Sequence, residues 1–445
     1  MCAAMCCGVN VMAGVSPVNK YSHTIVMDDE DDEDEDDEVV VSQTVVSADD
    51  NLPEGMTDRE IDSLLNEWAV KNYLTQDDSC KSSSENPDFP KETYVERLAH
   101  MPNVIEMPYN DVVRGFIDRY ASNMRRAVSL MLGAQNFYMP IFEEALESYQ
   151  VPLELKYLPV IESALNPGAT SRVGAAGLWQ FMITTGKQYG LEVTSLIDER
   201  RDPVKASYAA AHYLKDLYSI FGNWTLCVAA YNCGPGNVNK AIKRAGGVKD
   251  FWTIYPYLPA ETRGYVPAFI AANYIFNYYC EHNICPVNTR LPLSCDTIMV
   301  NKDLHMEQVR QVTGLDMEEL KALNPQYRTD IIPGSARPCA LKLPTTAVNA
   351  FLEAGDSIYT TRAEELFVNR REVAITDERP AVSNRSLRSS GKRGRSSRSS
   401  GRSVTVRKGD TLGAIARRNG TTVEKLKRVN GIKGSMIRPG QKLRF

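Results

Sequence analysis

Residues 153–181 read LELKYLPVIESALNPGATSRVGAAGLWQF, and the first half of this stretch predicts a helix. Pro152 suits the first turn of a helix, where its missing N–H needs no partner. Pro159 lies inside the run and predicts a kink, and Asn166-Pro167-Gly168 predicts the helix end. The apolar residues recur at three- to four-residue spacing and form one stripe: Leu155, Leu158, Ile161 and Leu165.

One carboxylate, that of Glu162, falls in the last turn of this predicted helix. The negative end of the helix dipole and the apolar neighbours both disfavour an anion, so both raise the pKa of the carboxyl group. A general acid needs such a raised pKa. On spacing alone, a solvated glutamate at a helix end is the competing interpretation, and motifs farther along the chain have to decide between the two.

The composition is that of a soluble globular protein, with 43% hydrophobic and 24% charged residues over 445 positions. The formal net charge of −5 conceals two segregated blocks. Residues 28–38 are eleven consecutive acids, and residues 383–403 contain seven Lys or Arg and no acid. Neither block can form a core of its own, because like charges repel and too little apolar surface is present.

The first twenty residues are apolar and rich in small side chains, like the second half of a signal peptide, but they lack basic residues before Lys20. A start codon assigned too far downstream would explain this pattern, and so would a cytosolic protein with an apolar end. No clean lipoprotein cleavage pattern surrounds Cys6 or Cys7. No 18-residue apolar span occurs elsewhere, so we expect no membrane-spanning helix.

The ten cysteines include no CxxC pair and no Cys/His cluster with zinc spacing. Cys280 with Cys285, and Cys295 with Cys339, could form disulfides in an oxidising compartment, and buried free thiols are the equal alternative. The five histidines are scattered. We therefore expect no metal site, no cofactor and no His-dependent triad.

Helical patterns dominate residues 91–285, with no alternation of strands and helices, so we predict an all-α domain there. We expect helices at 114–133, 139–149, 202–221, 224–232 and 262–279. In the third of these, Asp202 is the expected N-cap, Pro203 the first helical residue and Gly222 the residue after the end.

An internal repeat follows Pro286. Residues 313–334 and 419–440 match at a constant offset of 106, and both units are preceded by Asp-Thr and an apolar residue. Each unit reads strand, helix, helix, strand. The pairs matched at this offset are Gly314 with Gly420, Leu320 with Leu426, Lys321 with Lys427, Asn324 with Asn430, and Pro333-Gly334 with Pro439-Gly440. The segments that precede the two units are Asp296-Thr297-Ile298 and Asp410-Thr411-Leu412.

Four short signatures occur in order across the helical domain. They are Glu162-Ser163-Ala-Leu-Asn-Pro167, Gly177-Leu178-Trp179-Gln180, Ala230-Tyr231-Asn232-Cys233-Gly234 and Glu261-Thr262-Arg263-Gly264-Tyr265. Together they resemble the lytic transglycosylase and goose-type lysozyme superfamily, and most closely the membrane-bound lytic murein transglycosylase D family. The resemblance implies a lysozyme-like all-α catalytic domain over residues 91–285. Cys233 stands where Ala or Ser is common, and Trp179 replaces the usual Met.

The resemblance assigns the acid/base role to Glu162. It assigns substrate binding to Ser163, Gln180, Tyr231, Asn232 and Tyr265. Most glycosidases need two carboxylates, whereas only one is identified here among the motif positions. This favours substrate assistance, in which the N-acetyl group stabilises the cationic centre and the sugar's own C6 hydroxyl closes a 1,6-anhydro ring. The aromatic rings of Trp179, Tyr231 and Tyr265 are candidate stacking faces, and core packing is the even alternative for Trp179.

The repeat units resemble LysM modules, which bind glycans that contain N-acetylglucosamine. Residues 404–445 match well and residues 295–344 more loosely, so the latter unit is either a binder or a structural spacer. In such modules the groove lies between the first strand–helix turn and the second helix–strand turn. That places glycan contacts at Gly409, Asp410, Thr411 and Ile437.

The resulting prediction is a mainly α protein with βααβ modules, divided into a leader with an acidic segment (1–55), an extension (56–90), a catalytic domain (91–285), a degenerate LysM-like module (295–344), an Arg/Ser-rich linker (370–403) and a LysM module (404–445). The predicted activity is non-hydrolytic cleavage of peptidoglycan glycan strands in the cell envelope, periplasmic or outer-membrane associated. Any membrane association would come only through an N-terminal anchor. A hydrolase of the same fold and a non-catalytic wall-binding protein are the alternatives. The linker lacks aromatics to stack bases, so we expect no nucleic-acid partner.

Overall fold

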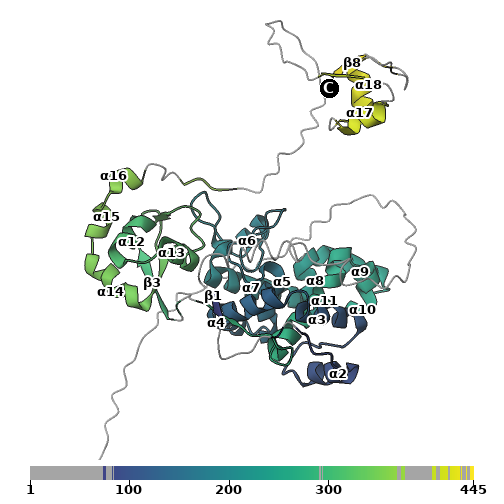
Figure 1. Cartoon of the computed structure of the whole chain (residues 1–445), viewed down its shortest axis with the longest axis horizontal. Coiled ribbons are helices and arrows are strands. Elements are labelled where there is room, and N and C mark those ends of the chain that lie inside the picture. Colours follow the sequence, from purple (N-terminus) through teal and green to yellow (C-terminus); the bar gives the residue numbers. More distant parts are fainter. Residues whose placement is uncertain are drawn as a thin grey trace, which may run out of the picture. The chain divides into compact units, whose positions relative to one another are not determined.

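The computed structural model describes residues 74–76, 83, 85–289, 292, 294–367, 372–375, 403–406, 411–418, 421–430, 432, 437 and 441–444. The chain forms two compact units, Met1–Asp377 and Glu378–Phe445 (Figure 1). The predicted leader and most of the predicted Arg/Ser-rich linker lie outside the described residues.

Over the described residues 85–285 the regular elements are helices, which confirms the predicted fold class. A short strand pair, β1 (Leu74–Gln76) with β2 (Val287–Thr289), joins the two ends of this part. The helices are α2 (Lys91–His100), α3 (Asp111–Ala121), α4 (Arg125–Ser148), η1 (Leu153–Tyr157), α5 (Leu158–Ser163), α6 (Ile183–Gln188), η2 (Glu199–Arg201), α7 (Pro203–Phe221), α8 (Trp224–Cys233), α9 (Pro235–Arg244), α10 (Phe251–Ile254), η3 (Tyr255–Tyr257) and α11 (Ala260–Tyr278).

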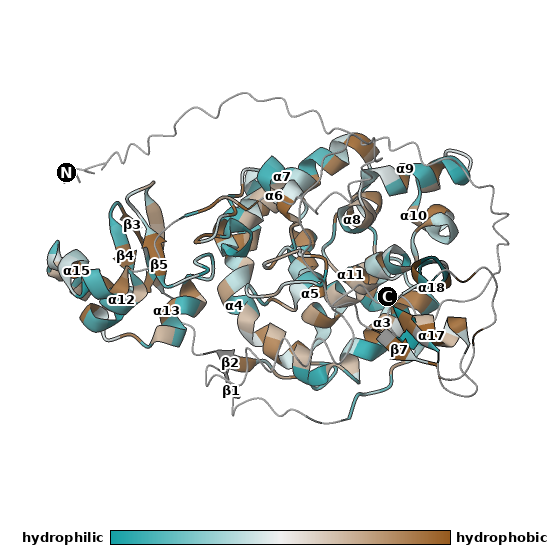
Figure 2. Cartoon of the chain, turned by 90° about the horizontal axis from the view of Figure 1, so that it is seen from above, coloured by the Kyte–Doolittle hydropathy of each residue, from teal (hydrophilic) through white to brown (hydrophobic). Residues whose placement is uncertain are grey.

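Helix α11 forms the centre of this helical part. Every residue from Gly264 to Phe276 is buried, and the helix packs against α3, α5 and α8. Pro267 inside α11 costs about 3 kcal/mol through a lost backbone hydrogen bond. Each buried Val, Ile or Phe contributes about 1.5–3 kcal/mol, so the several large apolar side chains of α11 outweigh that cost. In Figures 1 and 2, α5 and α11 lie in the middle of the helical part.

The predicted boundaries near residues 114–149 are wrong. The chain breaks at 122–124, between α3 and α4, and α4 then continues through Pro140 to Ser148. Helix α3 packs on α11 whereas α4 packs on α7, so the chain has to turn between them. Tertiary packing along α4 overrides the helix-breaking tendency of a single proline.

The predicted caps of α7 are confirmed. The Asp202 side chain accepts hydrogen bonds from the backbone N–H groups of Val204 and Lys205, and Pro203 is the first helical residue. Gly222 ends the helix in the left-handed region with φ 65°. These signals are local, which is why the sequence alone locates both ends of the helix.

After residue 294 the larger unit contains a small mixed module. Its strands pair antiparallel as β3 with β6 and β4 with β5. Two helices connect the strand pairs and further short helices follow. The elements are β3 (Cys295–Val300), β4 (Asp303–His305), α12 (Met306–Thr313), α13 (Met317–Leu323), β5 (Ile331–Pro333), β6 (Cys339–Pro344), α14 (Thr345–Ala354), α15 (Ser357–Thr360) and α16 (Ala363–Leu366).

The smaller unit repeats the core of this arrangement with β7 (Ser403–Thr405), α17 (Leu412–Arg418), α18 (Val423–Asn430) and β8 (Lys442–Arg444), and β7 pairs with β8. One asparagine makes the same contacts in both modules. Asn324 exchanges hydrogen bonds with the backbone of Lys342, and Asn430 does so with Arg444. In each case the side chain ties the second helix to the last strand, so the repeat is structural.

One part of the predicted repeat is wrong. Asp296 and Thr297 lie within β3, whereas Thr411 precedes the first helix residue of α17 and its hydroxyl caps that helix through Ala414 N–H. The residue in the place of Thr411 is His305, which caps α12 and stands at the same offset of 106. The Asp-Thr pair is therefore a chance likeness.

Neither of the two candidate cysteine pairs forms a disulfide, and free thiols, the alternative, are found at Cys295 and Cys339. Cys280 is a free thiol whereas Cys285 is disulfide-bonded, and none of the other described cysteines is its partner. Cys295 and Cys339 are free and stand at opposite ends of the β3–β6 pair, where Cys295 faces Pro344 and Cys339 faces Val300. A five-residue separation along a strand is about 16 Å, far beyond disulfide reach.

Among the described residues, no helix has both the length and the apolar character needed to cross a membrane. The same residues contain no group of three or more His, Cys, Asp or Glu side chains that could bind a metal ion.

Candidate active site

The site begins at the junction of η1 and α5. The chain changes from a 3₁₀ turn to an α-helix at Leu158, one residue before Pro159, so the predicted kink falls at this junction. Helix α5 ends at Ser163, earlier than predicted, because Ala164 and Leu165 adopt left-handed backbone with φ 50° and 59°. Such conformations cost about 1–3 kcal/mol each outside glycine and cluster at functional sites. Glu162 lies in the last turn, as the sequence predicts.

A tight turn, residues 169–181, follows α5 and carries Gln180. Ala176 bridges to both Thr170 and Phe181. Gly177 has φ 85°, and a Cβ there would lie 1.8 Å from the Arg200 carbonyl oxygen. Only glycine can occupy this position, which explains the second signature in steric terms.

Ser163 connects the turn to α5. Its buried hydroxyl lies 3.0 Å from the Pro159 carbonyl and 2.9 Å from the Leu178 carbonyl, and it donates to one at a time. This places Ser163 behind the site, outside the set of residues that line the cavity. The geometry therefore gives it a supporting contact between α5 and the turn.

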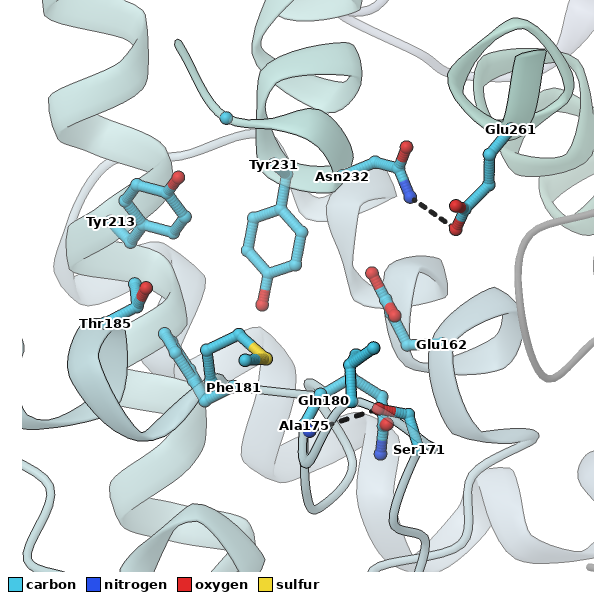
Figure 3. Close-up of a pocket in the computed structure, with 13 residues that line it drawn as sticks. Glu162, Ser171, Ala175, Gln180, Phe181, Thr185, Tyr213, Tyr231, Asn232 and Glu261 are labelled. Atoms are coloured by element: carbon cyan, nitrogen blue, oxygen red, sulfur yellow. Dashed lines mark hydrogen bonds between the residues drawn. The ribbon is translucent and has the colours of Figure 1, made fainter. Parts of the chain in front are cut away.

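A cavity of about 290 Å³ opens between the turn, α5, α7, α8 and the start of α11. Figure 3 shows Glu162 and Glu261 on one side, Tyr213 and Thr185 on the opposite side, and Tyr231 between them. Gln180 and Ser171 lie below, on the turn. The lining residues are Glu162, Ser171, Val173, Ala175, Gln180, Phe181, Met182, Thr185, Tyr213, Tyr231, Asn232, Gly234 and Glu261.

The pKa of Glu162 is raised to about 8, as the sequence reasoning expects in direction. Burial is the main cause, the hydrogen bond from Tyr265 opposes it, and the nearby Glu261 carboxylate adds to it. The Tyr265 hydroxyl donates to Glu162 Oε1. Glu162 is thus protonated at neutral pH, with one oxygen held by Tyr265 and the other free to carry the proton toward the cavity.

Tyr231 and Tyr265 contribute different groups to the site. The Tyr231 hydroxyl donates to the Trp179 carbonyl at 2.8 Å, and its ring lines the cavity. Tyr265 is fully buried and reaches the site only through its hydroxyl, so it offers no stacking face. Trp179 is also fully buried, with its indole N–H donating to Ser207 Oγ at 2.9 Å. For Trp179, core packing is therefore the correct alternative.

Glu261 is the functional candidate that the sequence reasoning missed. Its carboxylate lines the cavity and accepts a 3.4 Å hydrogen bond from Asn232 Nδ2. Asn232 Oδ1 in turn accepts from the Thr262 hydroxyl at 2.8 Å. The expectation of a single motif-borne carboxylate is wrong. The signal was present, because Glu261 stands four residues before Tyr265 and so lies on the same face of α11.

Gln180 and Cys233 have more limited contacts. The Gln180 side-chain amide donates to the Gly177 carbonyl at 2.7 Å, and the residue adopts left-handed backbone with φ 47°. Cys233 is a half-buried free thiol at the end of α8 that packs against the core, and burial raises its pKa to about 11, so it adds bulk and no nucleophile.

Several lining residues carried no motif signal. Phe181, Met182 and Tyr213 form the apolar and aromatic part of the wall, and Val173 stands 56% exposed at its edge. Their spacing along the sequence could not identify them, because the turn and α7 come together only in the folded structure.

The predicted glycan contacts of the C-terminal module are only partly described. Gly409 and Asp410 lie outside the described residues. Thr411 caps α17, and Ile437 is partly buried against the core of its unit. Their binding role stays a prediction.

Comparison with known proteins decides the family. Membrane-bound lytic murein transglycosylase D of Escherichia coli K12 is 31% identical over 341 residues, which cover 76% of this chain and 69% of that protein. This chain belongs to the membrane-bound lytic murein transglycosylase D family. The resemblance inferred from the four signatures is thereby confirmed.

Three family models match this chain. They are the transglycosylase SLT domain over residues 139–253, the LysM-like domain of lytic transglycosylase MltD over 294–360, and the LysM domain over 404–445. The soluble lytic murein transglycosylase of E. coli K12 is 35% identical over 124 residues, covering 26% of this chain and 19% of that protein. The solved 70 kDa soluble lytic transglycosylase of E. coli aligns with a TM-score of 0.30 and 26% identity, covering 39% of this chain and 29% of that one.

Proposed function

We propose that this protein is a peptidoglycan lytic transglycosylase in which Glu162 is the acid and then the base. It cleaves the β-1,4 bond between N-acetylmuramic acid and N-acetylglucosamine and leaves 1,6-anhydro ends. The observation that carries the proposal is the protonated Glu162 carboxyl, which lines a cavity of about 290 Å³ and is held by the Tyr265 hydroxyl.

The chemistry balances without water. Glu162 gives its proton to the glycosidic oxygen as the bond from that oxygen to C1 of the muramic acid breaks. The substrate's N-acetyl group stabilises the positive charge at C1. The C6 hydroxyl of the same sugar then forms a bond to C1 and returns its proton to Glu162. The attack is intramolecular, so proximity contributes strongly to its rate.

The surrounding groups suit a sugar substrate. Gln180, Tyr231 and Asn232 offer amide and hydroxyl groups to sugar hydroxyls and acetamido groups, and the exposed part of the Tyr231 ring offers an apolar face. We assign them substrate binding. Tyr265 we assign to holding Glu162, and Ser163 to holding the turn on α5, since its hydroxyl contacts only the Pro159 and Leu178 carbonyls among the described atoms.

A hydrolase of the same fold is the second candidate, because Glu261 supplies a second carboxylate in the cavity. A hydrolase would use Glu261 to activate a water molecule or to form a covalent intermediate. Against this role, the Glu261 carboxylate is exposed and accepts a hydrogen bond from Asn232, which acts as its partner in the wall of the cavity. If the protein is a hydrolase, Glu261→Gln should abolish turnover. If it is a transglycosylase, turnover should persist in this variant.

The remaining parts of the chain fit attachment to the wall. We propose that residues 91–285 form the catalytic domain and that the LysM module at 404–445 holds the enzyme on glycan strands, with the intervening basic segment as a tether. The protein would act in the cell envelope, periplasmic or associated with the outer membrane.

The proposal is tested by incubating purified full-length protein and its Glu162→Gln variant with peptidoglycan. The wild-type protein should release anhydro-muropeptides. The variant should release none while it still sediments with the wall. Wall binding without any product from the wild-type protein would leave only a binding function.

A further inference from the structure

One segment of the helical part, residues 192–198, packs into the LysM-like module and is here called the docking segment. Leu196 and Ile197 are nearly fully buried in the hydrophobic core of the module. Asp198 N–H donates to the Gln326 carbonyl, and Arg328 N–H donates to the Leu196 carbonyl, each at 2.8 Å. The module therefore completes its own core with side chains from the helical part.

A second strand-like piece, residues 372–375, pairs with the docking segment. Ser195 N–H donates to the Val373 carbonyl at 2.8 Å, and Thr194 bridges to Ala374. Arg337 of the module forms ion pairs with Glu192 and Glu372, both at 2.9 Å. The docking segment is thus held both by the module and by residues 372–375, all of which follow it in the chain.

The docking segment leads directly to the wall of the active site. Asp198 and Arg200 form a buried bidentate ion pair, with Nε to Oδ1 at 2.9 Å and Nη2 to Oδ2 at 2.8 Å. The remaining guanidinium nitrogen, Nη1, donates to the Gly174 carbonyl at 2.8 Å and to the Phe181 carbonyl at 2.9 Å. The Arg200 carbonyl also packs against Gly177. Arg200 therefore holds the turn that carries Gln180 at two points, Gly174 and Phe181.

This turn and the residues directly after it form the larger part of the cavity wall. Seven of the thirteen lining residues fall between positions 171 and 185. A buried bidentate arginine–carboxylate pair fixes geometry strongly, because both hydrogen bonds have to be kept together. A displacement of about 1 Å at such a site can lower a reaction rate by on the order of 100-fold.

We propose that the LysM-like module is a fixed support of the active site: by gripping the docking segment it sets, through the positioning residues Asp198 and Arg200, the place of the turn that forms the substrate-binding wall. The module's helix–strand turn at 324–330 is engaged by the docking segment, and that turn is one of the two that would line a LysM glycan groove. The wall-binding role therefore belongs to the C-terminal module, and the LysM-like module belongs to the catalytic unit. The kinetic part of this inference rests on the proposed function, and its structural part does not.

The structural part is tested by hydrogen–deuterium exchange on full-length protein. Ile197→Asp places a charge in the core of the module and should release the docking segment. The amides of Ala176, Gly177 and Gln180, which are hydrogen-bonded within the turn, should then exchange at least about tenfold faster. Lys342→Ala is the matched control, because its ammonium group contacts the ring of Phe137 across the same two parts, at 5.6 Å, without touching the docking segment. Unchanged exchange at the turn in Ile197→Asp would overturn the proposal.

If Ile197→Asp does not fold, Arg337→Gln replaces it, since that side chain is partly exposed and its loss removes only the two ion pairs at the edge. Exchange at the turn should again rise, to a smaller degree, and the same result as in Lys342→Ala would overturn the proposal. A thermal unfolding curve of Ile197→Asp shows whether that variant folds and hence whether Arg337→Gln is needed.

The kinetic part uses soluble glycan fragments and a double-mutant cycle. Ile197→Asp and Arg200→Gln should each raise KM at least about tenfold while the alkaline limb of the pH profile stays in place, because Glu162 lies on the other wall. The double variant should be no worse than Arg200→Gln alone. If the double variant raises KM by the product of the two single effects, the coupling is contradicted. It is also contradicted if only kcat falls, in proportion to the fraction of unfolded protein. If wild-type protein turns over no glycan, the proposed function fails and the exchange experiment still decides the structural inference.

Discussion

Tyr265→Phe isolates the interaction that opposes the effect of burial on Glu162. The substitution removes only the hydroxyl that donates to Glu162 Oε1 and keeps the fully buried ring. That hydrogen bond favours the carboxylate, so it lowers the pKa of Glu162, while burial and Glu261 raise it to about 8. Without the hydroxyl, the pKa should rise further.

The size of the shift follows from the strength of the bond. A hydrogen bond to a charged acceptor contributes about 1.5–3 kcal/mol, and one pKa unit corresponds to about 1.36 kcal/mol. These values give about one to two units if the hydroxyl favours the carboxylate alone. The neutral carboxyl oxygen also accepts from Tyr265, though more weakly, so we expect the lower end, about one unit.

The assay is the initial rate on soluble glycan fragments across the alkaline range. The general acid must be protonated, so the rate is constant below the pKa of Glu162 and falls as the pH rises through it. In wild-type protein the fall should be centred near pH 8, the pKa of Glu162. In Tyr265→Phe it should move about one unit higher, with a thermal unfolding curve as the control for folding. A limb that stays in place or moves to lower pH would refute this account of the site.

Three further perturbations test other contacts. Glu261→Gln removes a neighbouring negative charge, so the alkaline limb should move to lower pH while turnover persists; loss of all turnover would instead support a hydrolase. Gly177→Ala should destabilise the fold by roughly 2–4 kcal/mol in denaturant unfolding, because its Cβ would lie 1.8 Å from the Arg200 carbonyl. Gly174→Ala, with φ 93° but open space around the added Cβ, is the control and should cost only about 1 kcal/mol; equal costs would contradict the packing argument. Deleting residues 404–445 should weaken sedimentation with the wall and leave turnover of soluble glycan intact, and a collapse of that turnover would contradict the division into domains.

The sequence predicts best where the determining contacts are local. The caps of α7 depend on Asp202 and Gly222 within their own turns, and both predictions hold. Glu162 is placed in the last turn of its helix by spacing that extends over a dozen residues. In these cases neighbouring residues carry all the necessary information.

The failures share a dependence on distant contacts. The break between α3 and α4 exists because the two helices pack on different partners, α11 and α7. Glu261 belongs to the site because the start of α11 meets the end of α5 in space. Asp296 and Thr297 resemble the first turn of a LysM module by composition, yet strand pairing places them within β3. The role of the docking segment is likewise set by residues more than a hundred positions farther along the chain.

The most direct measurement is the chemical identity of the product ends. Peptidoglycan is digested by full-length protein in ¹⁸O-labelled water, and the muropeptides are analysed by mass spectrometry. A transglycosylase that uses Glu162 as acid and then base should yield 1,6-anhydro-muramic acid ends without incorporated ¹⁸O, and Glu162→Gln should yield none. Reducing ends that carry ¹⁸O, or undiminished product from Glu162→Gln, would contradict the central claim.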